Sequence, residues 1–186
     1  QGGSSSIVSA DAATLVAGSA NNITLNNAGN DFSSVNITSA NVATLNDTSD
    51  IILGTSSATT LNVTAAGNIT QSGAITTTGD ATFTVGSGKG IDLSTSANSF
   101  GGVLTFGPSS GSLSFLGLNT NTNIDLSALT LSGNLTAITS GGNITMSGGS
   151  NHATGYAYGY GTSYTTEHGV NIDTYGTLNA GTGSVT

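Results

Sequence analysis

The feature that most constrains the fold of this chain is a short alternating segment that recurs along its length. Each segment holds two apolar residues two positions apart, separated by Thr, Asn or Asp and bordered by Gly, Asn or Ser. Such residues face one side of a β-strand, so the pattern predicts many short strands closed by turns. The segments are Ile23–Leu25, Val35–Ile37, Leu61–Val63, Phe83–Val85, Ile91–Leu93, Ile124–Leu126 and Ile144–Met146.

The sequence also repeats on a larger scale. Residues 7–35 align with 75–103 at an offset of 68, with ten identities in 29 positions. Residues 67–73 recur as 142–148 at an offset of 75, which places a short insertion between the matches, in an expected loop at Leu116–Asn123. Residues 1–148 therefore predict two units of about seventy residues, at about 1–73 and 74–148.

Units of this size with several short strands predict stacked coils. We expect an all-β fold, a right-handed parallel β-helix (β-solenoid) of about 7–9 coils with about 20–25 residues in each. Gly107–Gly111, which contains the single proline, Pro108, is expected to be a turn. The predicted core residues are Ile23, Leu25, Val35, Ile37, Leu61, Val63, Ile69, Phe83, Ile91, Leu93, Val103, Ile124, Leu126, Leu135, Ile144, Ile172 and Leu178.

Composition excludes several functional classes. The 186 residues include one Lys, no Arg and nine acidic residues, for a formal net charge of −8. A single cation cannot neutralise a phosphate backbone, so no nucleic-acid partner is expected. The chain has no Cys, which excludes disulfides and thiolate zinc sites. It has no run of 18 apolar residues, so no membrane insertion is expected.

The sequence gives little support for catalysis, a metal or a cofactor. Asp47 and Asp50 could hold a cation, but the segment around them is simpler to interpret as a turn. His168 beside Glu167 lacks a nucleophile elbow, and we interpret it as a surface histidine. Residues 87–94 match the calcium-binding nonapeptide only in part, without a tandem copy. We therefore expect no enzyme, no catalytic or metal-ligating residue and no cofactor.

Residues 149–186 differ from the rest and contain all five Tyr. Tyr156, Tyr158 and Tyr160 alternate with small residues, so one strand would carry three rings on one face, and Tyr164 follows closely. Three interpretations stay open for this Tyr/Gly-rich tail: a cap on the last coil, docking onto another subunit, or stacking on a ligand. After the tyrosines, 170–173 and 178–180 return to the repeat pattern and predict one more coil.

Several segments resemble the repeats of bacterial filamentous-haemagglutinin-type proteins. These are Asn21–Phe32, Val35–Thr38, Leu53–Thr55 and Leu61–Ala65, and the resemblance covers about residues 10–148. It implies a right-handed parallel β-helix in a large secreted or surface-exposed adhesin. The Asn-Pro-Asn-Gly motif of that family's secretion domain does not occur here, so the secretion route stays open.

These observations lead to one functional expectation and its alternatives. Open solenoid ends carry unpaired strand edges, and stacking one end on another produces a filament. We expect an extracellular or cell-surface protein with a structural or adhesive role that forms a head-to-tail homopolymer with itself. Host or matrix glycans are further possible partners. The alternatives are a monomeric glycan-binding or ice-binding solenoid and a fragment of a larger secreted adhesin. A chain that starts at Gln1 also suggests a processed protein or an excised piece.

Overall fold

The structure is a computed structural model that describes residues 5–126, 130–140 and 144–146, together with the backbone of four later strands. Its strands are β1 (Val8–Gly18), β2 (Ile23–Leu25), β3 (Asp31–Ala40), β4 (Val42–Asp47), β5 (Ile51–Ala58), β6 (Thr60–Ala65), β7 (Ile69–Gln71), β8 (Ile75–Thr77), β9 (Ala81–Val85), β10 (Ile91–Phe100), β11 (Leu104–Pro108), β12 (Leu116–Thr120), β13 (Ile124–Asp125), β14 (Leu135–Thr139), β15 (Ile144–Met146), β16 (His152–Ala153), β17 (Ala157–Tyr160), β18 (Tyr164–Thr166) and β19 (Asn171–Ile172).

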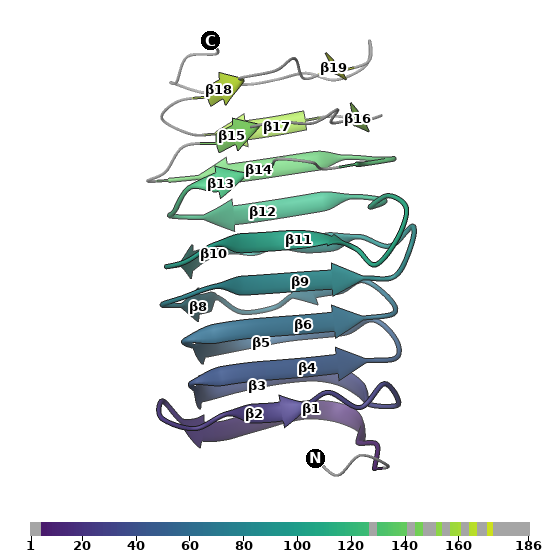
Figure 1. The fold of residues 1–186 in the computed structure, drawn as a ribbon, viewed down its shortest axis with the longest axis vertical. Helices are drawn as coiled ribbons and strands as arrows, with labels where there is room; N and C mark the ends of the chain where they lie inside the picture. The colour runs from purple at the N-terminus through teal and green to yellow at the C-terminus, as the bar shows by residue number, and fades with distance from the viewer. Residues whose placement is uncertain are drawn as a thin grey trace.

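The strands form a parallel β-solenoid, as the sequence predicts. Figure 1 shows the front strands running in one direction and those behind them in the other while the chain rises, which is a right-handed coil. A nine-stranded sheet follows the order β1-β3-β5-β7-β10-β12-β14-β17, with β8 beside β5 and β10. A five-stranded sheet follows the order β11-β9-β6-β4-β2. None of the described residues forms a helix that could cross a membrane.

The length of each turn varies along the stack. Ile69 lies opposite Ile51, 18 positions away, whereas Leu116 lies opposite Ile91, 25 positions away. The structure has about six turns, slightly fewer than the predicted number. In the described part of the chain, β14 and β17 extend the nine-stranded sheet beyond β12.

Two predicted loops are wrong in detail. Leu116–Thr120, placed in a loop by the sequence, is strand β12, and the irregular segment lies before it at 109–115. Pro108 is the last residue of β11 and lies opposite Val85 in the ladder. A proline fits there because β11 is the outermost strand of the five-stranded sheet, and an edge strand tolerates the missing N–H.

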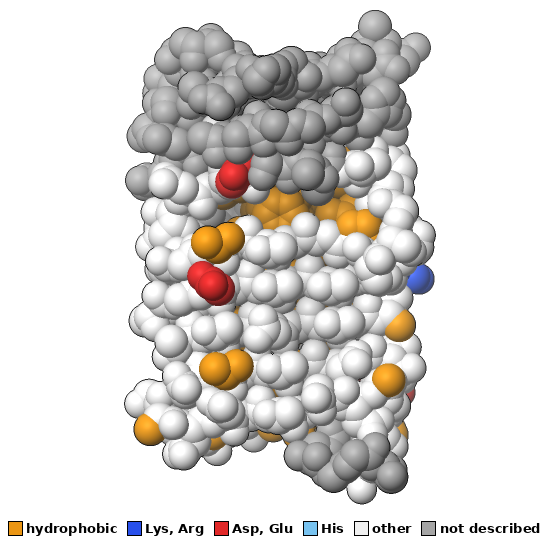
Figure 2. Space-filling view, viewed as in Figure 1, with side chains coloured by type: hydrophobic (Ala, Val, Ile, Leu, Met, Phe, Trp, Pro, Cys, Tyr) orange, Lys and Arg blue, Asp and Glu red, His pale blue; other side chains and the backbone are white. Residues whose placement is uncertain are grey.

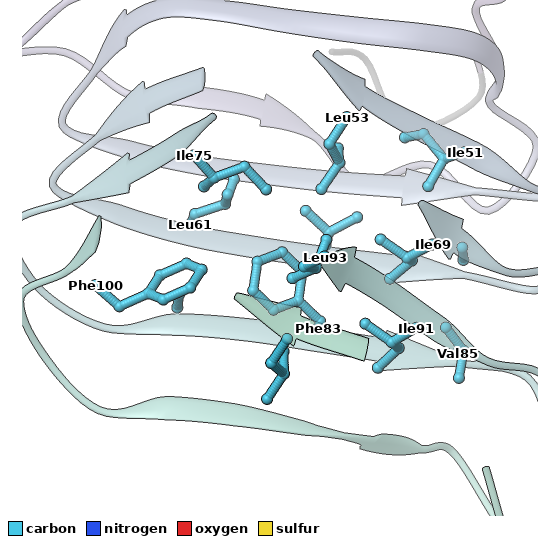
Figure 3. Close-up of a cluster of buried hydrophobic side chains, with 14 of the residues drawn as sticks. Ile51, Leu53, Leu61, Ile69, Ile75, Phe83, Val85, Ile91, Leu93 and Phe100 are labelled. Atoms are coloured by element: carbon cyan, nitrogen blue, oxygen red, sulfur yellow. The ribbon is translucent and has the colours of Figure 1, made fainter. Parts of the chain in front are cut away.

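Apolar side chains from successive turns stack in columns inside the solenoid. One column consists of Ile51, Ile69, Ile91, Leu116 and Leu135, all of them buried, and Figure 3 shows its first three members side by side. Phe83 and Phe100 meet across the interior with ring centroids 6.1 Å apart at an interplanar angle of 74°. This edge-to-face arrangement is favourable for two aromatic rings.

Most of the predicted core is confirmed, with one clear error. Of the seventeen residues, Leu25 is only partly buried, and Ile172 and Leu178 lie where the structure describes no side chain. Val103 is 67% exposed. The offset of 68 aligned Val103 with the buried Val35, but β10 ends at Phe100, so Val103 falls at a corner instead of inside a strand.

A buried asparagine closes one corner of the solenoid. The Asn98 side chain accepts a hydrogen bond from Ile75 N at 2.9 Å and donates one to Leu93 O at 2.9 Å. Asn30, 68 positions earlier, makes the equivalent pair of bonds to backbone groups of the first turn. The sequence repeat thus preserves a corner in which an amide side chain pairs buried backbone groups.

The repeat does not preserve the face of the solenoid. Ile23 lies in the five-stranded sheet, in register with Ala43, whereas its equivalent Ile91 lies in the nine-stranded sheet beside Ile69. Ile23 and Ile91, which are equivalent at the offset of 68, therefore lie on different faces of the solenoid as well as in different turns.

The Asn98 corner provides a test of the fold. We expect Asn98→Ala to lower the free energy of unfolding by about 3 kcal/mol, because it leaves buried backbone groups without partners. Asn46→Ala, which removes one exposed amide with a 3.4 Å hydrogen bond, should change it by about 0.5 kcal/mol or less. Urea unfolding followed by circular dichroism measures both changes, and equal midpoints for the two variants would contradict this role of Asn98.

Candidate functional site

The predicted tyrosine cluster is described only through its backbone. Tyr158 and Tyr160 belong to β17, in register with Thr136 and Ile138 of β14, and Tyr164 begins β18 in a different sheet. Tyr156 lies outside the described residues, as do Glu167 and His168. The structure thus puts Tyr158 and Tyr160 on one strand, and Tyr164 on another sheet. Whether their rings dock or stack remains a prediction.

The first turn leaves the apolar core partly uncovered. Within the described part of the chain, β1 pairs only with β3, and β2 pairs only with β4. Leu15 and Leu25 are partly buried, whereas Leu45, in register with Leu25 one turn later, is 1% exposed. Among the described strands none pairs with β1 or β2 on the side away from β3 and β4, and we call this surface the first-turn end.

Exposed valines lie on β1 at the first-turn end. Val8 is 75% exposed and Val16 is 66% exposed. The only charged residue of β1 is Asp11, which lies within a register shift between Ser9 and Ala12. Apart from that irregularity and two further shifts near Val16, β1 presents an edge of eleven residues, most of them apolar. Such an edge can pair with another strand.

The acidic turn after β4 is structural, as the sequence interpretation favoured. The buried carboxylate of Asp47 accepts hydrogen bonds from Phe32 N at 2.6 Å and from Ser49 N at 2.8 Å. The Ser49 hydroxyl donates to Asp31 at 2.8 Å. The described residues contain no group of three or more His, Asp or Glu side chains that could hold a metal ion. Asp47 therefore has the role of pairing backbone N–H groups of adjacent turns.

The outer face of the five-stranded sheet carries polar residues in register. One column consists of Thr24, Thr44, Asn62, Thr82 and Thr105, and a second of Asn46, Thr64 and Thr84. Figure 2 shows this face: side chains that are neither charged nor hydrophobic cover its centre, a hydrophobic patch lies above them beside the grey residues, and the single cation lies at one border. The sequence contains these Thr pairs but does not reveal their alignment, because the turns differ in length.

A groove lies on the nine-stranded sheet where one side chain is missing. Asp92, Gly117 and Thr136 occupy successive register positions on β10, β12 and β14. Gly117 leaves an opening between its two neighbours, and the resulting cavity has a volume of about 220 Å³. Its lining residues are Asp92, Ser94, Phe115, Leu116, Gly117, Asn134 and Thr136, and we call it the Gly117 groove. Sequence reasoning missed this site, because it depends on the register of three turns.

A family model of repeats of unknown function (DUF5649) matches three successive segments, at residues 1–39, 39–107 and 114–157. The matches run through both predicted sequence units and into the tyrosine-rich segment. Comparison with curated proteins and with solved structures gave no match.

The role of Asp47 can be tested directly. We expect Asp47→Ala to lower the free energy of unfolding by about 2 kcal/mol, because Phe32 N and Ser49 N lose their acceptor. Asp11→Ala removes an exposed carboxylate and should have an effect within about 0.5 kcal/mol. Thermal unfolding of the three proteins at one pH measures the difference, and an Asp11→Ala loss as large as that of Asp47→Ala would contradict the assignment.

Proposed function

The chain belongs to this family of repeats of unknown function, and from that premise we propose that it is an extracellular structural or adhesive protein of the filamentous-haemagglutinin type. In this proposal the solenoid stacks end to end on a second copy of itself. The assembly is a filament on the cell surface or outside the cell, and the protein is not an enzyme.

The observation that carries the proposal is the uncovered core at the first-turn end. Ala13, Leu15 and Leu25 pack against the core yet stay partly exposed, and Val8 and Val16 lie open beside them. Burying apolar side chains is favourable in proportion to the area removed from water. A further turn placed beneath β1 and β2 would cover Ala13, Leu15 and Leu25, which face the core, and would extend both ladders.

A second copy suits this position for a geometrical reason. Every pairing in the described chain is parallel, so β17, which ends the nine-stranded sheet on the side away from β1, runs in the direction that a strand beneath β1 requires. Contact between two different ends of identical chains does not close on itself and continues as a filament. Asp11 is the only charged residue among residues 5–25, so charge repulsion at this end is small.

The main alternative is that an earlier turn of a longer chain occupies the same place, as in a segment of a larger secreted adhesin. That arrangement uses the same edge and the same apolar side chains. The two differ in one measurable property, because only self-stacking makes the isolated chain assemble with increasing concentration.

We expect Val16→Lys to prevent assembly, because a lysine on an edge strand opposes pairing with a further strand. Val103→Lys is the matched control, since Val103 has nearly the same exposure, 67% against 66%, but lies at a corner on the side of the solenoid. Sedimentation velocity over a concentration series and negative-stain electron microscopy measure assembly. Filaments from the unmodified chain and Val103→Lys, but not from Val16→Lys, are the expected result.

A monomeric unmodified chain at all concentrations would overturn the self-stacking proposal and favour the segment of a longer solenoid. Filaments from Val16→Lys would place the contact elsewhere on the molecule.

The polar columns of the five-stranded sheet favour a second candidate function, binding to ice. Neighbouring strands lie about 4.8 Å apart, and residues i and i+2 lie about 6.6 Å apart along a strand. The two columns of Thr and Asn therefore form a regular, uncharged array of hydrogen-bonding groups. Such an array can hold water molecules in an ordered layer that joins an ice surface.

This candidate predicts measurable thermal hysteresis in a dilute solution of the protein. Thr82→Tyr should remove most of it, because one bulky ring breaks the plane in the middle of the array. Thr76→Tyr makes the same change at an exposed position of the other sheet and should leave it intact. Absence of hysteresis in the unmodified protein would eliminate the candidate.

A further inference from the structure

The Gly117 groove combines a half-buried aromatic ring with polar groups from three successive turns. Phe115 precedes β12, and its ring lies so close to Gly90 that a Cβ there would clash with the ring. The ring is thus held against the backbone of the preceding turn, with part of its surface left in the groove.

Gly117 is essential to the shape of this groove. Its Cα is buried between two turns, and a Cβ at this position would lie 2.5 Å from Asp92 Oδ1. Any side chain would therefore fill the opening or displace Asp92. The absence of a side chain at this position leaves a cavity floor of backbone and Leu116.

The polar groups of the groove include hydrogen-bond donors and hydrogen-bond acceptors. Asp92 Oδ1 accepts hydrogen bonds from Ser94 N at 3.0 Å and from Ser94 Oγ at 2.5 Å. Asp92 Oδ2 has no hydrogen-bond partner within the described part of the chain. Asn134 and Thr136 line the opposite side with an amide and a hydroxyl, each able to donate and to accept.

We propose that the Gly117 groove binds one sugar residue of a neutral glycan. A sugar ring has an apolar face of C–H groups and an edge of hydroxyls, which match an aromatic ring beside a carboxylate, an amide and a hydroxyl. The proposal rests on the proposed adhesive function, and it names the class of ligand and the site.

Charge and size limit the ligand further. The lining holds one carboxylate and no cation, and the protein has a net charge of −8, so acidic sugars and phosphates are disfavoured. The volume of about 220 Å³ is below the range usual for drug-sized ligands, which fits one ring with the rest of the glycan outside.

The experiment is frontal affinity chromatography on the immobilised full chain with four labelled neutral trisaccharides: maltotriose, cellotriose, mannotriose and chitotriose. We expect at least one to be retained with a dissociation constant of about 1 mM, as for a small open site. Phe115→Ala should weaken this binding by about tenfold through loss of ring stacking. Asp92→Asn should weaken it about as much, because a neutral acceptor replaces a charged one.

Two matched controls keep the test specific. Phe106→Ala removes another half-buried phenylalanine from the five-stranded sheet, and Asp11→Asn removes a remote carboxylate. Both should retain the trisaccharide as the unmodified chain does. Retention of none of the four sugars would overturn the inference, as would equal retention by Phe115→Ala, or stronger retention of 3′-sialyllactose than of any neutral sugar.

Sedimentation of the same preparations separates this inference from the proposed assembly. Filaments without sugar retention overturn the groove as a glycan site and leave self-stacking intact. Sugar retention by a strictly monomeric chain supports the groove while overturning self-stacking.

Discussion

Parallel hydrogen bonding between successive turns is the constraint on which this structure depends. Each turn buries its apolar side chains only because the turns before and after it hold the same register, as in the column of Ile51, Ile69 and Ile91. A solenoid turn alone cannot bury its inner face, so stability comes from neighbours. The same dependence leaves Leu15 and Leu25 partly exposed, since β1 and β2 have a described neighbour on one side only.

Local alternation made the inner face predictable from the sequence. Apolar residues two positions apart, such as Leu61 and Val63, both turn inward wherever a strand forms, and this holds without knowledge of the neighbouring turn. The internal repeats indicated in addition that these strands form stacked coils. The fold class and most of the core could therefore be predicted from short-range patterns.

Register between turns could not be predicted, because the turns differ in length from 18 to 25 positions. Two residues separated by a fixed number of positions therefore do not always lie on the same face of the solenoid. Val103 is the clearest consequence: its aligned partner Val35 is buried in a strand, while Val103 lies exposed at a corner. The Gly117 groove was missed for the same reason. Asp92, Gly117 and Thr136 are remote in sequence, and only the ladder makes them neighbours.

One departure from regular repetition gives the nine-stranded sheet its groove. The longest step between turns, from Ile91 to Leu116, contains the irregular segment at 109–115 and ends with Phe115 in the groove. A regular turn would place Thr or Asn at such outward positions, as the five-stranded sheet does in its two columns. Regular turns supply a rigid neutral surface, whereas a lengthened turn beside a glycine supplies depth and an aromatic ring. The lengthened turn is therefore where we propose a sugar site, whereas the regular turns carry the flat polar columns.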